Sequence, residues 1–406
     1  MTVNKNFDVV IIGGGMVGLS IAFQLLETDK TNNICIIDKE KHLGMHSSGR
    51  NSGVLHAGIY YKPGSLKAKV CIKGAKRLIS WTESKNLPIN RCGKVIIPQK
   101  SSLDEQVDLL FERGKRNGAV VEIIKDDKLK EIAPSARSNT GRAIWSPNTV
   151  VVNALKIVQS LEEELIKKGV IIFKGQNNLK FTKHTNKIIL KDSYEISYGH
   201  LFNCAGLYAD VIAHKFDIGK AYKIIPFKGQ YWMLKKDSKI RVNCNIYPVP
   251  DLNVPFLGVH FTPSAEIDSK VSIGPTANLS WGRENYNGIQ SLELINSIKN
   301  LITITNQYFK NKDGFKKYVH EQALLTIKPL VVNSARALIP TLKSSDVIRS
   351  NKVGIRSQLF NIEKEKLEDD FICINGQNST HVLNAISPAF TASFELADKI
   401  IEFSNI

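Results

Sequence analysis

A glycine-rich turn near the N-terminus constrains the fold of this chain more than any other feature. The run 7–12 is apolar and reads as a strand, residues 16–27 have the spacing of an amphipathic helix, and the apolar run 34–38 follows. The turn between the first strand and the helix has the pattern GxGxxG, formed by Gly13, Gly15 and Gly18. A strand, a glycine turn, a helix and a second strand in this order predict a βαβ unit that binds a dinucleotide.

Each position of this motif has a mechanical role in holding a pyrophosphate. Gly13 makes the tight turn, Gly15 lets the backbone approach the phosphates, and Gly18 lets the helix pack closely on the strand. The helix N-terminus stabilises the phosphate charge. Asp38, twenty residues after Gly18, can bond the ribose hydroxyls, and its neighbour Lys39 belongs to the same predicted site. The alternative is a glycine turn without a ligand.

The polar segment 44–53 helps to choose between the two common dinucleotides, since GxGxxG turns bind NAD and FAD alike. This segment, GMHSSGRNSG, follows the ribose acid and is rich in backbone N–H groups, hydroxyls and one guanidinium. It suits an extended pyrophosphate and a flavin ribityl chain. The residues predicted to contact FAD are Ser48, Arg50, Asn51, Ser52 and Gly53. The alternative is a flexible surface loop, but the apolar runs 54–55 and 59–61 favour an ordered segment.

Two later segments are expected to reach the same cofactor. The run 201–206 reads as a buried strand that ends on Ala205 and Gly206, whose small size permits close approach. Near the C-terminus, Asn384, Ser387 and Pro388 lie before or at the start of a predicted helix over 388–403. Pro388 suits the first helical turn and Ser387 can cap it. A helix start aimed at the flavin pyrimidine would stabilise negative charge on the reduced ring; an ordinary cap is the alternative.

The chain has βαβ-like pieces on both sides of a β-rich middle. Helices are also predicted from Ser65, over 102–117 and over 153–168, whereas 227–274 alternates aromatic and β-branched residues without a good helix. The expected fold class is therefore α/β plus α+β: a Rossmann-like domain with an inserted antiparallel-sheet domain. The predicted domains are a cofactor domain of residues 1–85, 145–220 and 345–406, and a substrate domain of residues 86–144 and 221–344.

Charge and composition argue against several classes of protein. The net charge is +17, from 55 basic and 38 acidic residues, and the basic residues are scattered without a block of five. Compositional drift is the favoured explanation, and weak association with an anionic membrane surface is the alternative. The sequence has no nucleic-acid motif, no metal-ligand cluster and no nucleophile triad, and its six cysteines form no CxxC.

Membrane spans and targeting segments are also not expected. No apolar run reaches the roughly 18 residues that a span needs. The first predicted strand starts too early to leave room for a signal or transit peptide. We therefore expect a cytoplasmic protein, with a peripheral position on the cytoplasmic face of the membrane as the alternative.

Four stretches along the chain are distinctive. They are 48–68 (SGRNSGVLHAGIYYKPGSLKA), 245–250 with 255–262 (NIYPVP and PFLGVHFT), 354–358 (GIRSQ) and 381–389 (HVLNAISPA). Together they resemble the L-2-hydroxyglutarate dehydrogenase/oxidase family, within the D-amino-acid-oxidase-like flavoproteins; Ile386 stands where that family usually has proline. The resemblance implies FAD, a cofactor domain of the glutathione-reductase type, and oxidation of a 2-hydroxy dicarboxylate, L-2-hydroxyglutarate, to its 2-oxo product. Quinone or oxygen would accept the electrons.

Flavin-dependent oxidation of an alcohol needs a base for the hydroxyl proton and groups that hold the substrate carboxylates. His56 is the predicted base, because histidine titrates near neutral pH and this one lies in the segment expected beneath the flavin. A purely hydrogen-bonding role is the alternative, and His260 is the rival base. Arg356 resembles the superfamily's carboxylate-binding arginine, since a guanidinium offers two parallel bonds; a surface arginine is the alternative. Candidates for the second carboxylate are Lys228, Tyr247 and Tyr60.

Other functions stay open from the sequence. An amino-acid or amine oxidase of the same superfamily, or a glycerol-3-phosphate-dehydrogenase-like enzyme, would use the same cofactor domain. A protein that binds FAD or NAD for tethering without turnover would also carry the GxGxxG turn.

Overall fold

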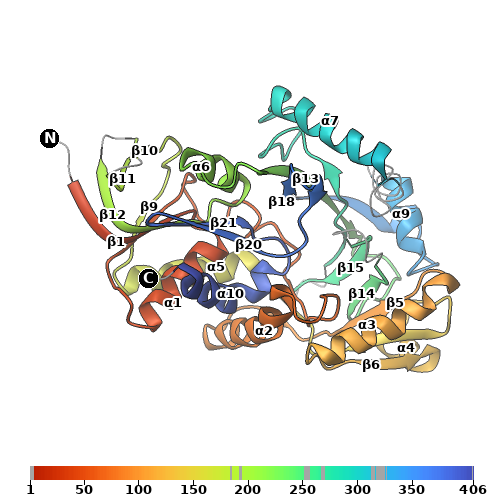
Figure 1. Cartoon of the computed structure of the whole chain (residues 1–406). Helices are drawn as coiled ribbons and strands as arrows, with labels where there is room; N and C mark the ends of the chain where they lie inside the picture. The colour runs from red at the N-terminus through yellow and green to blue at the C-terminus, as the bar shows by residue number, and fades with distance from the viewer. Residues whose placement is uncertain are drawn as a thin grey trace.

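Two large sheets organise the computed structural model, which describes residues 4–182, 185–191, 194–250, 257–266, 270–311, 316, 325, 327–404 and 406 (Figure 1). Pro255 and Phe256, from one of the family-like stretches, lie outside the described residues. The first sheet has eight strands in the order β10-β11-β12-β1-β2-β9, with β21 beside β12 and β20 beside β21. The strands are β1 (Asn4–Ile12), β2 (Ile34–Ile37), β9 (Ile171–Phe173), β10 (Lys180–Thr182), β11 (Lys187–Ile189), β12 (Glu195–Asn203), β20 (Ile372–Gly376) and β21 (Ser379–Asn384).

The centre of the first sheet is parallel, and it is covered on both faces. Strands β21, β12, β1, β2 and β9 pair in parallel. All four residues of β2, Ile-Cys-Ile-Ile, are buried, as expected for a strand covered on both faces. Four helices share one apolar cluster with β1 and β2: α1 (Met16–Glu27), α2 (Leu66–Ser84), α5 (Ala154–Lys167) and α10 (Ala389–Ser404). Helix α6 (Ala209–Lys215) and the β10–β11 hairpin pack on the opposite side.

The second sheet has ten strands in the order β19-β18-β13-β16-β15-β14-β5-β7-β6, with β17 beside β13. Its pairs are antiparallel except β14 with β5. The strands are β5 (Lys94–Ile97), β6 (Glu122–Lys125), β7 (Arg142–Ser146), β13 (Tyr222–Leu234), β14 (Asn245–Pro248), β15 (His260–Pro263), β16 (Val271–Gly274), β17 (Asn278–Leu279), β18 (Val347–Asn361) and β19 (Lys366–Leu367). The accompanying helices are α3 (Asp104–Arg116), α4 (Asp126–Ile132), α7 (Leu294–Lys310) and α9 (Lys328–Arg336). A small third sheet joins β3 (Val54–Leu55), β8 (Val150–Val152) and β4 (Ile89–Asn90).

The predicted helices agree with the structure to within one or two residues at each end. The expectations 102–117 and 153–168 correspond to α3 and α5, and the expectation 388–403 corresponds to α10. Ser65 caps α2 as predicted, because its hydroxyl accepts a hydrogen bond from the Ala68 N–H at 3.2 Å. The three-residue turn Ser101–Leu103 precedes α3 as a separate 3₁₀ helix.

One long strand lies in a different sheet from the one that the sequence suggests. The predicted cofactor domain includes 347–361, but β18 pairs with β13 of the ten-stranded sheet over almost its whole length. Strand β7 also crosses the predicted boundary at 144/145. Sheet membership depends on partners more than a hundred residues away in sequence, so local patterns do not reveal it. The exact division into two domains stays a prediction.

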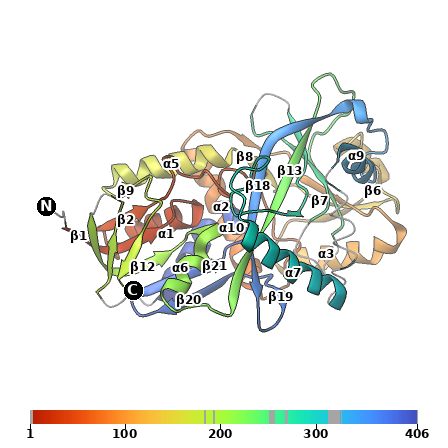
Figure 2. The same ribbon diagram turned by 90° about the horizontal axis from the view of Figure 1, so that it is seen from above.

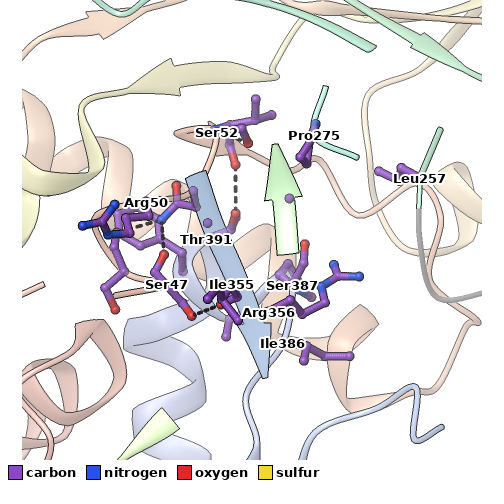
Figure 3. Close-up of a pocket in the computed structure, with 18 of the residues that line it drawn as sticks. Ser47, Arg50, Ser52, Leu257, Pro275, Ile355, Arg356, Ile386, Ser387 and Thr391 are labelled. Carbon is purple, nitrogen blue, oxygen red and sulfur yellow. Dashed lines mark hydrogen bonds between the residues drawn. The ribbon is translucent and has the colours of Figure 1, made fainter. Parts of the chain in front are cut away.

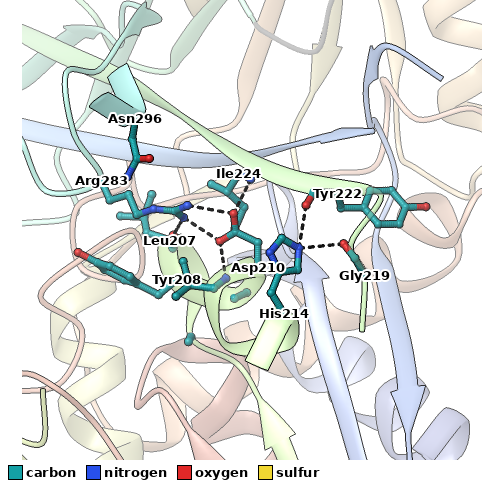
Figure 4. Close-up of polar contacts among 12 residues, drawn as sticks. Leu207, Tyr208, Asp210, His214, Gly219, Tyr222, Ile224, Arg283 and Asn296 are labelled. Atoms are coloured by element: carbon teal, nitrogen blue, oxygen red, sulfur yellow. Dashed lines mark hydrogen bonds and ion pairs between the residues drawn. The ribbon is translucent and has the colours of Figure 1, made fainter. Parts of the chain in front are cut away.

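A buried ion pair connects the two sheets (Figure 4). Asp210 in α6 is 3% exposed, and Arg283, which precedes α7, binds it through two parallel contacts of 2.8 and 3.0 Å. The same carboxylate accepts the backbone N–H of Ile224 in β13 at 2.8 Å. Asp210 therefore ties a helix of the first sheet to the longest-paired strands of the second.

Replacing Asp210 by asparagine should destabilise the protein strongly, because it leaves the largely buried Arg283 guanidinium with the more distant Glu293 carboxylate, 4.0 Å away, as its remaining ion-pair partner among the described residues. We expect the free energy of unfolding to fall by about 3–5 kcal/mol, measured by urea denaturation of the flavin-loaded protein. Lys399→Ala, which removes an exposed pair with Glu402, is the control and should leave the midpoint unchanged. Equal midpoints for both variants would contradict the role given to Asp210.

Candidate active site

Two cavities meet where the first sheet adjoins the second. The loop cavity, of about 540 Å³, is bordered by the glycine turn, by Asp38 and Lys39, and by Ala205 and Gly206. The inner cavity, of about 260 Å³, is bordered by residues 47–56 and 385–391 and by parts of β13 and β18 (Figure 3). Both cavities are lined by Met16, Val17, Ser47, Ser48, Ser357 and Ala385. The two cavities therefore adjoin along these residues, between the glycine turn and the second sheet.

The glycine turn has the geometry that its spacing predicts. Gly13 has a φ of +106°, and a Cβ there would lie 2.4 Å from the Cys204 carbonyl oxygen. A Cβ on Gly18 would lie 2.1 Å from the carbonyl oxygen of Gly13, so helix α1 could not pack at its present distance. Gly15 lines the loop cavity. The turn thus presents bare backbone to the cavity at the N-terminus of α1.

Asp38 holds the turn as well as facing the cavity. Its two carboxylate oxygens accept the N–H groups of Gly14 at 2.7 Å and Glu40 at 2.8 Å. Burial raises the pKa of this carboxyl, although both hydrogen bonds and the neighbouring His46 and Lys39 oppose the shift. Carboxylate oxygens have several lone pairs, so Asp38 keeps the capacity to accept ribose hydroxyls.

Next to Asp38, three side chains come together in a way that could suit a metal ion. Glu40, His46 and Glu284 place one ligand atom each within 4.8 Å of one another. The Lys39 ammonium, however, already pairs with Glu40 and lies 2.6 Å from Glu284. His46 Nε2 lies 2.9 Å from Glu40. Lys39 and His46 therefore already engage these carboxylates, so we assign no metal here.

The segment 47–53 is ordered by its own hydrogen bonds. Ser48 Oγ accepts the N–H of Met16 at 2.9 Å, which fixes the segment to the start of α1. Asn51 accepts the Gly53 N–H at 2.8 Å and donates to the Ser48 carbonyl at 2.7 Å. The Arg50 guanidinium donates to the Met45 carbonyl at 2.6 Å and lies 4.2 Å from the centre of the Tyr286 ring. A flexible loop is therefore the wrong description of this segment.

The structure brings most of the predicted cofactor residues to the two cavities, but not all of them. Gly13, Gly15, Asp38, Lys39, Ala205 and Gly206 line the loop cavity, Ser48 lines both, and Arg50, Asn51, Ser52, Ser387 and Pro388 line the inner one. Gly18, Gly53 and Asn384 line neither. Asn384 is fully buried, and its side-chain amide donates to the Asp370 carbonyl at 2.6 Å. It therefore stabilises the end of β21 without facing either cavity.

His56 lines the inner cavity as predicted. Its Nε2 lies 3.3 Å from the Ser387 hydroxyl, while its Nδ1 is buried without a partner among the described residues. Burial is the main cause that lowers the pKa of His56 to about 3, and the neighbouring cations Lys94, Arg356 and Lys67 add to it. The imidazole is therefore neutral at pH 7 and can accept a proton.

His260 lines the same cavity but is held more rigidly. Its Nδ1 lies 2.8 Å from the Gly258 carbonyl and therefore carries the ring proton. The ring stacks on Tyr247 with centroids 3.9 Å apart. Burial is the main cause that lowers its pKa to about 4. His260 is a neutral part of the wall.

Arg356 lies on β18 and lines the inner cavity beside Ser387. In the view of Figure 3, Arg356 and Ser387 lie on one side of the β18 ribbon and Arg50 lies on the other. Arg356 is partly buried and lines the inner cavity, which favours a role at the site over the surface-arginine alternative. Its charge lowers the pKa of His56 and of Lys67.

Two buried lysines near His56 were not predicted as site residues. Lys94 in β5 is fully buried, its ammonium has no partner among the described residues, and it lies 4.7 and 5.2 Å from the ring centres of Tyr60 and Tyr247. Burial lowers its pKa to about 8. Burial, and then the charge of Arg356, lowers the pKa of Lys67 to about 8 as well. Lys67 stands within a family-like stretch, but Lys94 gives no local signal, because a lysine that starts a strand normally points to water.

The structure distinguishes the three residues that were candidates for binding the second substrate carboxylate. Tyr247 lines the inner cavity, whereas Tyr60 and Lys228 do not. The Lys228 ammonium donates to the Asn285 side chain at 2.8 Å. Lys94 and Lys67 line neither cavity, but both place positive charge near His56.

Comparisons with known proteins agree with this geometry. The family described as FAD dependent oxidoreductase matches residues 8–401. The chain is 35% identical to the mitochondrial L-2-hydroxyglutarate dehydrogenase of Caenorhabditis briggsae, over 97% of this chain and 92% of that protein. It is 34% identical to the L-2-hydroxyglutarate dehydrogenase of Indibacter alkaliphilus, over 98% and 99%. The human mitochondrial enzyme of that name is 33% identical, over 98% and 88%.

Solved structures share the fold at low sequence identity. FAD-bound, dithionite-reduced L-alpha-glycerophosphate oxidase from Mycoplasma pneumoniae superposes with a TM-score of 0.76 at 18% identity, over 99% of this chain and 95% of that one. Glycine oxidase from Geobacillus kaustophilus gives a TM-score of 0.70 at 13% identity, over 98% and 95%. These similarities confirm the expected fold class. Among the described helices, none is long and apolar enough to span a bilayer.

Proposed function

This chain belongs to the FAD-dependent oxidoreductases and, within them, to the L-2-hydroxyglutarate dehydrogenases, and we propose that it oxidises L-2-hydroxyglutarate to 2-oxoglutarate. One observation carries the proposal: the neutral His56 lies within the field of Arg356, Lys67 and Lys94, at a cavity that adjoins the cavity of the dinucleotide turn. Such a concentration of positive charge attracts a small dianion.

The residues around the two cavities fit FAD. The loop cavity alone lies in the roughly 300–1,000 Å³ range of ligand pockets, and the bare turn at Gly13 leaves room for a pyrophosphate. Asp38 and Lys39 would hold the ribose end, Ser48, Arg50, Asn51 and Ser52 the middle, and Ala205 and Gly206 the opposite wall. Gly18, Gly53 and Asn384 would act by shaping the backbone. FAD, when bound, accepts the hydride from the substrate carbon.

Arg356 would bind one substrate carboxylate through two parallel bonds. Lys94 would favour the second carboxylate through its charge, because its buried ammonium lacks a partner among the described residues. Lys67 would add positive charge, although Asp370 and Asp369 partly offset it. Lys94 does not line the inner cavity, so its contribution is its field from behind Tyr247 and Tyr60. This arrangement supports a dicarboxylate over a monocarboxylate.

His56 would take the hydroxyl proton at Nε2. This nitrogen lies beside Ser387, which lines the cavity, whereas Nδ1 is buried. A proton can be accepted at Nε2 when the ring's own proton resides on Nδ1. Substrate carboxylates that offset the charges of Arg356, Lys67 and Lys94 would raise the pKa of His56 in the complex and make it a better base.

Electrons would leave the reduced cofactor for a quinone or for oxygen. The net charge of +17 supports weak association with an anionic membrane, on the cytoplasmic face if the chain acts in the cytoplasm. Association with a membrane would favour a quinone.

Anaerobic addition of L-2-hydroxyglutarate should bleach the flavin absorbance near its visible maximum within the dead time of manual mixing. D-2-hydroxyglutarate, L-lactate, L-glutamate and glycerol 3-phosphate serve as matched controls for stereochemistry, the second carboxylate, the amine and the phosphate. Much slower bleaching with each control is expected. Faster bleaching by L-glutamate or by glycerol 3-phosphate would replace the proposal with one of the alternatives.

A further inference from the structure

The segment between β17 and α7 reaches from the second sheet to the loop cavity. Four consecutive side chains in it, Arg283, Glu284, Asn285 and Tyr286, each contact a different part of the protein. We call residues 283–286 the strap. Strand β17, which precedes the strap, pairs with β13 of the second sheet, whereas Glu284 lines the cavity at the end of the first sheet. The strap therefore connects the second sheet to the site expected for the cofactor.

Two buried contacts fix the strap on either side of Glu284. The Arg283 guanidinium binds the Asp210 carboxylate of α6 through two parallel contacts of 2.8 and 3.0 Å (Figure 4). Asn285 is 1% exposed, and its side-chain oxygen accepts a hydrogen bond from the Lys228 ammonium of β13 at 2.8 Å. The Asn285 amide closes a turn by donating to two carbonyls three and five residues later, at 2.8 and 2.7 Å. The fold itself therefore positions the backbone at Glu284.

The Glu284 carboxylate bridges two side chains on opposite sides of the glycine turn. It lies 2.6 Å from the Lys39 ammonium and accepts the Tyr208 hydroxyl at 2.7 Å. Lys39 follows β2 and Tyr208 follows β12, and these two strands pair in parallel with opposite edges of β1. Strand β1 leads into the glycine turn, so the bridge crosses the edge of the sheet where a dinucleotide pyrophosphate is expected. All three side chains line the loop cavity.

Tyr286 makes a second contact, with the polar segment 44–53. Its hydroxyl lies 2.6 Å from His46 Nδ1, and the Arg50 guanidinium lies 4.2 Å from the centre of its ring. His46 lines the loop cavity, and Arg50 lines the inner cavity. Tyr286 therefore holds the segment that is expected to face the middle of the cofactor.

We propose that the strap closes over bound FAD and retains it, with the Glu284 bridge to Lys39 and Tyr208 as the contact that keeps it closed. A ligand leaves a closed site only after the segment that covers it opens. Because the bridge crosses the glycine turn, the Glu284 contacts would have to break before FAD is released. The inference concerns retention of the cofactor, so it does not depend on which substrate the enzyme oxidises.

The rate of FAD release tests this inference. The flavin-loaded protein is diluted, and free FAD is followed by its fluorescence. Glu284→Gln, which keeps the shape of the side chain but removes its charge, should release FAD roughly tenfold faster. Tyr208→Phe, which removes only the hydroxyl bonded to Glu284, should act in the same direction. Glu164→Gln is the matched control, since Glu164 pairs with Lys85 at 2.7 Å, has a side chain 23% exposed against 25% for Glu284, and lines neither cavity.

A double variant shows whether Glu284 acts through Lys39. Lys39→Met is expected to speed release by itself, because Lys39 also lines the cofactor cavity. If the bridge keeps the strap closed, Lys39→Met/Glu284→Gln should release FAD no faster than Lys39→Met alone. Effects that multiply would mean that the two residues act independently, and they would overturn the bridge.

The stability of the FAD-free protein separates retention of the cofactor from stability of the fold. Glu284→Gln and Glu164→Gln should have equal urea midpoints without FAD, because each loses one partly exposed ion pair. A lower midpoint for Glu284→Gln with an unchanged rate of release would make Glu284 a structural residue and overturn the inference. FAD that stays on the original protein after unfolding would reveal a covalent bond and overturn it as well. Failure of L-2-hydroxyglutarate to bleach the flavin would count against the proposed substrate only, since release is measured without substrate.

Discussion

Replacing His56 by glutamine is expected to lower kcat/KM for L-2-hydroxyglutarate by roughly 10²–10⁴-fold, the usual contribution of a positioned general base. Glutamine keeps a polar side chain of similar size beside Ser387 but accepts no proton at neutral pH. Steady-state rates with a dye acceptor measure the effect. His200→Gln is the matched control, since His200 is buried in the first sheet, bonds Thr380 at 3.0 Å and lines neither cavity.

His260→Gln separates the two candidate bases. His260 carries its ring proton on Nδ1 toward the Gly258 carbonyl and stacks on Tyr247, so its replacement should disturb substrate binding more than proton transfer. We expect a larger KM with a smaller change in kcat. A loss of kcat at His260 as large as that at His56 would transfer the role of base to His260.

The pH profile of the original enzyme should report the charges around His56. The pKa of His56 is lowered to about 3, so kcat/KM, which reflects the free enzyme, should show no loss from this group down to acid pH. Bound carboxylates offset the cations and raise this pKa, so the acid limb of kcat should lie at higher pH than that of kcat/KM. Lys67 and Lys94, with pKa values of about 8, lose their charge above that pH, and KM for the dianion should then rise.

Features that depend on neighbours in sequence were predictable. The turn at Gly13 follows from steric limits on a few consecutive residues, and the cap at Ser65 needs only the N–H three residues later. The order of segment 47–53 is partly local, because Asn51 bonds both Ser48 and Gly53, although Ser48 also accepts the distant N–H of Met16. Such features are determined by a few residues close together in the sequence, which is why they can be predicted from a single sequence.

Features that depend on distant partners were not predictable in the same way. Lys94 matters because Tyr60 and Tyr247, from other segments, enclose its ammonium. Strand β18 belongs to the second sheet because it pairs with β13. The residues 347–361 alone do not indicate that pairing. The exposure of Ile295 and Ile302 on α7, which lies at the outer edge of the second sheet (Figures 1 and 2), likewise depends on distant contacts, because Ile304 packs against Phe227 and Phe360. Each of these needs the fold to be known first.

Replacing Arg356 by glutamine should raise KM for L-2-hydroxyglutarate and lower kcat/KM by roughly 10²–10⁴-fold. Two charge-assisted hydrogen bonds, each worth about 1.5–3 kcal/mol, would be lost. Binding of the product 2-oxoglutarate, followed through its perturbation of the flavin spectrum, should weaken in parallel because the same carboxylate is held. Arg349→Gln is the matched control, since Arg349 is exposed on the same strand and lines neither cavity.

Arg356→Lys distinguishes a clamp from a source of charge. Lysine keeps the positive charge but presents a point charge in place of a planar fork. If Arg356 orients the substrate through two parallel bonds, the lysine variant should recover binding of 2-oxoglutarate but not kcat, and added methylguanidine should restore rate to the glutamine variant. If charge alone matters, the lysine variant should recover both. Because Lys67 and Lys94 already supply charge close to the cavity, the distinct contribution expected of Arg356 is orientation.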